Sequence, residues 1–257
     1  MILDRVDRMA DMPAIHVDDL SMAYREQPVL WDVDVDVPAG TLTAIVGPNG
    51  AGKTTLMKGI LGLMPIISGH ILLLGEPIDR VRRQIGYVPQ KSSVNWSFPT
   101  TVEDVVLMGR YAHLGWIRRP DRHDREIAED AMQSLGVTPY RHRQISELSG
   151  GQKQRVFLAR AMAQEATLYF LDEPFTGVDA VTERVLVDRL HELRDAGKTI
   201  LAVHHDLETL PAYFDRVILL NKVVIADGPV DEVMTDDNMA CAYGTPHQGA
   251  SHVDAAH

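Results

Sequence analysis

The sequence is poor in cysteine, in long apolar runs and in basic charge. Cys241 is the only cysteine among 257 residues, which excludes an intrachain disulfide and a metal cluster built on cysteines. No window approaches the roughly 18 consecutive apolar residues that a membrane-spanning helix needs. The first fifteen residues mix acidic and basic groups and lack the apolar centre of a signal peptide. We therefore expect a cytosolic chain that acts at a membrane only through a partner.

The balance of charge argues against a nucleic-acid partner. The chain carries 25 Lys and Arg against 36 Asp and Glu, a formal net charge of −11, whereas general nucleic-acid binders present a basic face. A hydrophobic content of 45% and a charged content of 24% are ordinary for a globular protein. The length suffices for one large domain or two small lobes.

The hydrophobic pattern predicts an α/β fold. Apolar and polar residues alternate between Ile15 and Val37, as in half-exposed antiparallel strands. Residues 43–46, 168–171 and 199–203 are short apolar strands, and the segment from Thr54 to Leu63 has helical spacing. Strands alternating with helices predict a parallel sheet with helices on both faces.

A helical block interrupts this alternation between about Lys91 and Ala166. Thr100 to Glu103 form a capping-box pattern that opens one helix, and Asp121 to Leu135 form a charged amphipathic helix. We expect this block to be a separate subdomain. The chain after Asp236 is rich in Gly, Ala and His and is expected to fray.

A phosphate-binding loop follows the strand at 43–46. Residues 47–54 match the pattern Gly-x4-Gly-Lys-Thr, with a strand before and a helix after. The glycines let backbone N–H groups converge on phosphate oxygens at a helix N-terminus. Lys53 would reach the β- and γ-phosphates and the Thr54 hydroxyl would bind Mg²⁺. A glycine-rich turn arising by chance is the alternative, and these flanks disfavour it.

Two carboxylates end the predicted strand at 168–171. Asp172 would hold Mg²⁺ through water at the carboxyl edge of a parallel sheet, and Glu173 would polarise the attacking water as general base. The alternative is a pair of helix-capping residues at a strand-to-turn junction. The phosphate loop in the same chain favours the catalytic interpretation.

A third motif, Leu148-Ser149-Gly150-Gly151-Gln152, lies between the other two. Ser149 and Gln152 form a capping box for the helix through Ala163. A serine hydroxyl with two glycine N–H groups at an uncovered helix N-terminus also forms a γ-phosphate site. The two interpretations are compatible.

With these three motifs the chain resembles the ATP-binding subunit of an ABC transporter over nearly its whole length. The resemblance implies an ABC cassette of the P-loop NTPase fold class, with a mixed-sheet core, an antiparallel β subdomain and an inserted α-helical subdomain. It also implies an ATPase that uses ATP and Mg²⁺. The cassette would span 14–240, with a core at 14–90 and 167–235, a helical subdomain at 91–166, an N-terminal extension at 1–13 and a flexible tail at 241–257.

The resemblance assigns further roles. In that family the Ser149–Gln152 segment reaches across a head-to-tail homodimer to the partner's nucleotide, and Asp179 lies in the loop that couples the two sites. His205 would contact the γ-phosphate and act in catalysis with Glu173 and Lys53, with His204 as its rival. The ATP-contacting set would be Tyr24, Gly47, Pro48, Asn49, Gly50, Ala51, Gly52, Lys53, Thr54, Thr55 and Gln90, and in trans Ser149, Gly150, Gly151 and Gln152; Thr54, Gln90 and Asp172 would hold Mg²⁺. Tyr24 would stack on adenine, although an aromatic at a strand end can equally serve packing.

A narrower resemblance concerns the transported substrate. Residues 87–91, 96–102 and 108–111, and the loop at 171–179, look like the ATPase subunits of manganese, zinc and iron importers. Trp96 and Gly115-Trp116 favour the manganese/iron branch, with zinc as the alternative. The segment after Gln90 would receive a helix of a polytopic permease; Trp96 and Trp116 either anchor that contact or pack within the subdomain.

The resemblance places the chain at the cytoplasmic face of the membrane, bound to the permease and served indirectly by an extracytoplasmic metal-binding protein. A non-transport ABC ATPase is the competing class. The chromosome-tethering type needs a long coiled-coil insertion, and the ribosome-associated type two cassettes and basic arms; neither is present here. The irregularly spaced His247, His252 and His257 favour a simple tail over a metal site.

Overall fold

The computed structural model describes residues 12–24, 27–94, 96–114 and 118–244. The strands are β1 Ile15–Tyr24, β2 Gln27–Val37, β3 Leu42–Val46, β4 Ser68–Leu73, β5 Ile85–Val88, β6 Leu168–Asp172, β7 Thr199–Val203, β8 Arg216–Asn221 and β9 Val223–Pro229. The α-helices are α2 Lys53–Ile60, α3 Ile78–Val81, α4 Val102–Leu107, α5 Tyr111–Leu114, α6 Arg122–Ser134, α7 Gly150–Ala163, α8 Ala180–Asp195, α9 Leu210–Tyr213, α10 Val230–Val233 and α11 Asp236–Tyr243.

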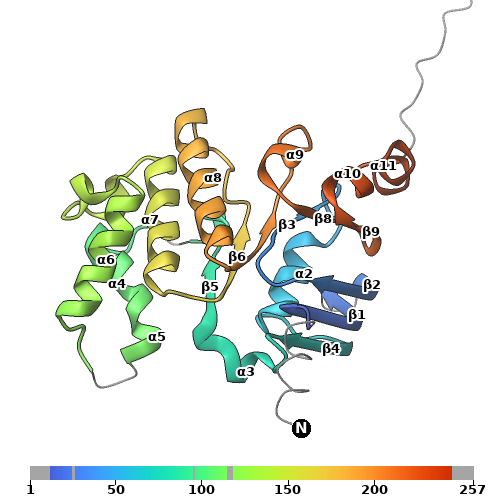
Figure 1. Cartoon of the computed structure of the whole chain (residues 1–257), viewed down its shortest axis with the longest axis horizontal. Helices are drawn as coiled ribbons and strands as arrows, with labels where there is room; N and C mark the ends of the chain where they lie inside the picture. Colours follow the sequence, from blue (N-terminus) through green and yellow to red (C-terminus); the bar gives the residue numbers. More distant parts are fainter. Residues whose placement is uncertain (1–11, 25–26, 95, 115–117, 245–257) are drawn as a thin grey trace, which may run out of the picture.

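Figure 1 shows a central sheet with an antiparallel sheet on one side and a block of helices on the other. The central sheet has the order β5-β6-β7-β3-β8-β9, and all neighbours are parallel except β8 and β9. The smaller sheet has the order β2-β1-β4 and is antiparallel. The predicted fold class is confirmed: the chain is an α/β cassette with an antiparallel part and a helical part.

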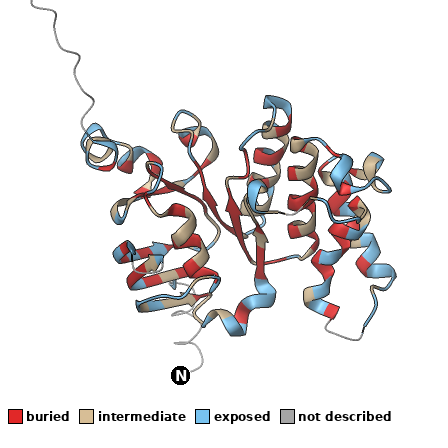
Figure 2. Cartoon of the chain, turned by 180° about the vertical axis from the view of Figure 1, so that it is seen from behind, coloured by how far each residue is buried: buried red, intermediate tan, exposed pale blue. Residues whose placement is uncertain are grey.

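The inner strands β3, β6 and β7 of the central sheet are buried on both faces, as short continuous apolar strands predict. In β3, Leu42, Ala44 and Val46 face the core shared with the helical side, while Ile45 faces the core shared with α2 and the antiparallel sheet. Figure 2 shows buried residues concentrated along these strands. In β2, by contrast, alternate residues are buried and the aspartates between them are exposed. The alternation read from the sequence therefore identified the one-sided sheet.

In the sequence, the helical block is inserted between β5 and β6. It contains α4, α5, α6 and α7 and lies to one side of the central sheet (Figure 1). The capping box of α4 pairs Thr101 with Asp104, one residue later than the predicted pair of Thr100 and Glu103. Thr101 adopts the extended conformation of an N-cap, and Thr100 lies before it. The predicted box of α7, Ser149 with Gln152, is present.

Three parts of the chain differ from the sequence expectations or were not foreseen by them. Strands β4, β5, β8 and β9 were not predicted. The expectation of fraying after Asp236 is wrong as far as Tyr243, because α11 forms there with Thr235 as its N-cap. Residues 245–257, with the tail histidines, and residues 1–11 of the N-terminal extension lie outside the described residues. Within the described part of the chain, no helix is long and apolar enough to span a membrane.

Candidate nucleotide-binding site

The site lies at the carboxyl edge of the parallel strands, where α/β sheets bind ligands. Strand β3 leads into the phosphate loop, and its neighbour β7 leads into His204. Strand β6 ends at Asp172, and the adjacent β5 leads through Pro89 to Gln90. The strand order thus brings together segments that are up to about 160 residues apart in the sequence.

The geometry of the phosphate loop explains its glycines. Gly47 has a φ of 151°, and a Cβ at this position would overlap the Leu220 carbonyl oxygen. Gly52, the N-cap of α2, has a φ of 100° and gives that helix no side-chain cap. The first N–H groups of α2 are therefore left for an anion, and the positive end of the helix dipole favours one.

Lys53 is buried at the start of α2 and folds back over the loop. Its Nζ donates to the Gly47 and Pro48 carbonyl oxygens over 2.7 and 2.9 Å. Burial lowers the pKa of Lys53, and the nearby Glu173 carboxylate acts in the opposite direction. Phosphate oxygens would be stronger acceptors for this ammonium than two neutral carbonyls.

Two of the candidate magnesium ligands, Thr54 and Asp172, are in contact. The Thr54 hydroxyl donates to Asp172 Oδ1 over 3.1 Å, and Asp172 is 1% exposed. Burial raises the pKa of Asp172, although the bond from Thr54 opposes the shift. A hydroxyl, a carboxylate and the amide oxygen of Gln90 form a set of hard oxygen donors that fits Mg²⁺. A cation here would also offset the burial of the ionised carboxylate.

Glu173 is held by two side chains. Gln90 Nε2 and Thr176 Oγ1 both donate to Glu173 Oε2, over 2.9 and 3.2 Å. Glu173 has a φ of 53°, a conformation that non-glycine residues adopt at a cost and that is enriched at functional sites. All three residues line a cavity of about 420 Å³. Thr176 was not assigned a role from the sequence; its only signal was a hydroxyl three residues after Glu173.

The two adjacent histidines have different environments. His204 is buried, its Nε2 is 2.8 Å from Thr209 Oγ1, and its ring packs edge-on against Phe175. Burial and the proximity of His205 lower the pKa of His204 to about 4. His205 is exposed beyond the end of β7. The environment of His204 is that of a structural histidine, which leaves His205 as the one accessible to a ligand.

The capping motif at the start of α7 is exposed. Ser149 N donates to Gln152 Oε1 over 2.9 Å, and Gln152 N donates to Ser149 Oγ over 3.3 Å. Asp179 caps the neighbouring α8 by accepting from Val181 N and Thr182 N. A Cβ on Gly151 would contact Thr182 and Asp179. The structure therefore brings Asp179 beside the Ser149–Gln152 segment.

The aromatic positions divide between exposed and packed. Tyr24 ends β1 and is 62% exposed, which favours a stacking role over packing. Trp96 is half-buried, packs on Phe157 at a centroid distance of 5.0 Å and donates to the Lys91 carbonyl oxygen. Trp96 therefore packs within the helical block, whereas Phe98 beside it is exposed. Gly115 and Trp116 lie outside the described residues.

A contact from the C-terminal helix was missed by the sequence reasoning. A hydrogen bond joins the backbone of Gly47 to the Tyr243 hydroxyl in α11; burial raises the pKa of this tyrosine, and the bond opposes the rise. Asn221 Nδ2 donates to the Ala242 carbonyl oxygen in the same helix. The C-terminal helix thus supports the first residue of the phosphate loop. No local pattern signals a contact over nearly two hundred residues.

A glycine-rich loop, a buried lysine and a strand-end aspartate on one sheet edge define a P-loop nucleotide-binding protein. Residues 30–176 match the family profile described as ABC transporter, and the chain belongs to this family. It is an ATP-binding subunit with the ATPase activity of that family.

Relatives match over most of the chain. The zinc transport system ATP-binding protein TroB of Treponema pallidum (strain Nichols) is 57% identical over 231 residues, covering 90% of this chain and 87% of TroB. The manganese transport system ATP-binding protein MntB of Bacillus subtilis (strain 168) is 52% identical over 230 residues, covering 90% and 92%. A solved structure described as the ATP-binding subunit of an ABC transporter superposes with a TM-score of 0.75 at 30% identity, covering 86% and 91%.

Proposed function

We propose that this chain powers the import of a divalent transition metal through a partner permease. The observation that carries this proposal is its similarity to relatives named for zinc and for manganese transport. The segment from Tyr87 to Tyr111 and the Phe175-Thr176-Gly177-Val178 version of the coupling loop support the same substrate class. We favour manganese or iron, with zinc as the alternative substrate.

The active unit in this proposal is a head-to-tail pair of identical chains. Among the described residues, the Ser149 hydroxyl accepts a hydrogen bond only from Gln152 N, and the Gln152 side chain accepts only from Ser149 N. Both lie at an exposed helix N-terminus. A second copy would present its γ-phosphate there, where the positive end of α7 favours negative charge. Asp179, beside Gly151, would link the two sites. ATP contacts available only in the closed pair would shift the population toward closure.

Each residue of the sheet edge would then have one task in hydrolysis. The backbone N–H groups of residues 47–54 and Lys53 bind the phosphates, and Tyr24 stacks on adenine. Glu173, oriented by Gln90 and Thr176, takes a proton from the attacking water. His205 and Ser149 of the partner copy stabilise charge on the γ-phosphate as it grows. Thr54, Gln90 and Asp172 would hold Mg²⁺, which would supply positive charge to the phosphates.

The permease would contact the helical block, at the cytoplasmic face of the membrane. A small hollow of about 140 Å³ lies there, lined by apolar residues that include Val94, Phe98 and Met108. Exposed Phe98 beside such a hollow suits the insertion of a partner side chain. An external metal-binding protein would deliver the ion to the permease, so this chain need not touch the transported metal.

Metal accumulation in cells lacking this chain tests the proposal. Uptake of Mn, Fe and Zn should be compared in cells carrying no copy, the intact gene, or the Glu173→Gln variant. We expect uptake of one metal to fall at least severalfold and to return only with the intact gene. Unchanged uptake of all three metals, or failure to co-purify with a polytopic membrane protein, would contradict the transport role and favour a non-transport ATPase.

A further inference from the structure

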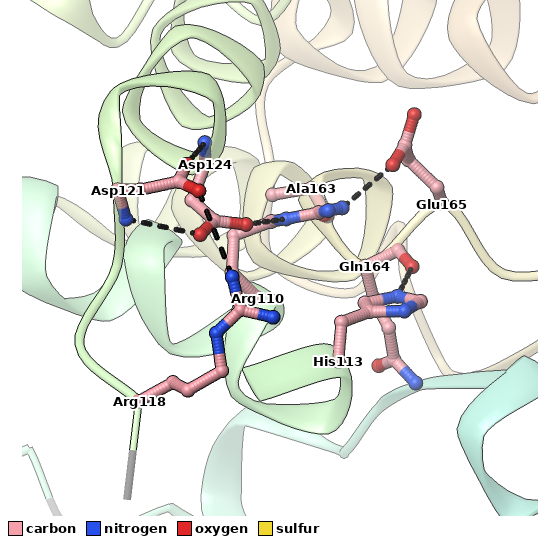
Figure 3. Close-up of polar contacts among 8 residues, drawn as sticks. All are labelled: Arg110, His113, Arg118, Asp121, Asp124, Ala163, Gln164 and Glu165. Carbon is pink, nitrogen blue, oxygen red and sulfur yellow. Dashed lines mark hydrogen bonds and ion pairs between the residues drawn. The ribbon is translucent and has the colours of Figure 1, made fainter. Parts of the chain in front are cut away.

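The C-terminal end of α7, opposite the Ser149 cap, is fixed by a buried arginine. Arg110 Nη1 donates to the Ala163 carbonyl oxygen over 2.8 Å and to Glu165 Oε2 over 2.7 Å. Its Nε donates to Asp124 Oδ1 over 3.0 Å, and both side chains of this ion pair are 7% exposed. Figure 3 shows the guanidinium between the end of α7 and the start of α6.

Both helix ends favour this arrangement electrostatically. Ala163 is the last residue of α7, where the negative end of the dipole attracts a cation. Asp124 is in the first turn of α6, where the positive end attracts an anion, and its Oδ2 accepts from Asp121 N. Burial alone would raise the pKa of Asp124, but the bonds from Arg110 and Asp121 outweigh it and lower the pKa.

Gln164, the residue after Ala163, connects the same end of α7 to the central sheet. Gln164 Nε2 donates to the Ile85 carbonyl oxygen over 2.6 Å, at the start of β5, and His113 Nε2 donates to the Gln164 carbonyl oxygen over 2.7 Å (Figure 3). A Cβ on Gly109 would overlap the Arg160 carbonyl oxygen, so the 3₁₀ turn Met108–Arg110 lies directly against the last turn of α7. The strand that receives Gln164 is the one that leads to Gln90.

We propose that Arg110 is a positioning residue for the ATP site of the partner copy. A 14-residue helix is roughly 21 Å long, so a tilt of about 5° at its Arg110 end displaces Ser149 by about 2 Å. Misplacement by about 1 Å can lower a catalytic rate about 100-fold. By holding Ala163 against α6, Arg110 sets the direction in which the distant Ser149 faces. This inference rests on the proposed role of Ser149 in trans.

A purely structural role of Arg110 predicts the same effect on both nucleotide sites of the pair. Replacing a buried ion pair by apolar residues of similar volume is often neutral or stabilising. The double variant Arg110→Met with Asp124→Leu should therefore stay folded, with a modest loss of stability from the missing bond to Asp121 N, and it cannot bond to the Ala163 carbonyl oxygen. Arg122→Met, which breaks an exposed ion pair on α6, is the matched control.

The test uses two differently tagged full-length copies in mixed pairs in which one phosphate loop is inactivated by Lys53→Ala. In the first arrangement, the double variant and Lys53→Ala are in the same copy, so the remaining loop faces the altered α7. In the second, Lys53→Ala is in the other copy, so the remaining loop faces an unaltered α7. We expect turnover to fall at least tenfold in the first arrangement only, with unchanged ATP binding, and no effect of Arg122→Met.

Equal losses in both arrangements, or no loss in either, would overturn the positioning role. Ser149→Arg, placed in the first arrangement instead of the double variant, is the reference. If it leaves turnover unchanged, the proposed shared site is wrong, and the positioning role of Arg110, which rests on it, is wrong as well. If the double variant does not fold, Arg110→Lys takes its place. Lysine can pair with Asp124 but cannot reproduce the forked contacts, so the same asymmetry is expected with a smaller loss.

Discussion

Gln90 donates a hydrogen bond to Glu173 over 2.9 Å and so joins the segment that enters the helical block to the carboxylate proposed as general base. Both residues line one cavity. A shift of the helical block relative to the sheet would therefore be transmitted to Glu173 through Gln90. This relationship gives a direct route by which a permease could influence hydrolysis.

Removing the charge of Glu173 should separate binding from turnover. We expect Glu173→Gln to bind ATP with little change and to lower turnover at least 100-fold, because a neutral amide cannot accept the water proton. The variant should also accumulate an ATP-bound dimer in size-exclusion chromatography. The matched control is Glu126→Gln on the exposed face of α6. Turnover at the wild-type rate would show that Glu173 is not the base.

A charge placed at the α7 cap should act on the partner. In mixed pairs with one Ser149→Arg copy, we expect at least a tenfold loss of turnover at the nucleotide site of the unaltered copy. Arginine removes the cap and projects into the position proposed for the γ-phosphate. Gln133→Arg, the same change of charge on exposed α6, is the control. Loss confined to the altered copy's own phosphate loop would refute the shared site.

Substituting His204 should change the stability of the chain, whereas substituting His205 should change its turnover. The pKa of His204 is lowered to about 4, below its unfolded value of about 6.5, so the unfolded chain binds the extra proton between these values. Stability should fall as pH decreases from 6.5 to 4, by up to about 3 kcal/mol. His204→Gln should remove this dependence in thermal melts. His205→Gln should keep it but lower turnover; the reverse pattern would exchange their roles.

Asp172 should limit stability when no nucleotide is bound. Because burial raises its pKa, its favourable contribution is present below the unfolded value of about 3.9 and is lost as pH rises through the folded pKa. At pH 7 we expect Asp172→Asn to stabilise the nucleotide-free chain by about 1 kcal/mol, a rise of about 2–4 °C in Tm. The exposed Asp130→Asn should change nothing.

Asp172→Asn should also lose the added stability that ATP gives in the presence of Mg²⁺. This stability is measured as the difference between the ATP-induced shifts in Tm with and without the metal. An undiminished magnesium effect would remove Asp172 from the proposed ligand set.

Local patterns predicted the parts of the site that depend on neighbours in sequence. The phosphate loop, the strand end at Asp172 and the capping box of Ser149 each need only a few consecutive residues, because a backbone turn or a helix start dictates them. The capping box of α4 shifted by one residue because Thr100 and Thr101 both fit the motif. Only the backbone conformation distinguished them.

Contacts between distant segments could not be predicted in this way. The bond between Gly47 and Tyr243 and the bond from Arg110 to the Ala163 carbonyl oxygen depend on tertiary packing. The expected fraying after Asp236 was wrong for the same reason, since α11 is anchored by Asn221 of β8. Composition alone gave no sign of that anchor.

One N–H group at the start of α7 already has a partner within a single chain, since the Ser149 hydroxyl accepts from Gln152 N. In the shared arrangement proposed above, a phosphate oxygen would take over this donor, so closure exchanges one hydrogen bond for another. In that arrangement the nucleotide would itself hold the two copies together, and its cleavage would let the pair separate.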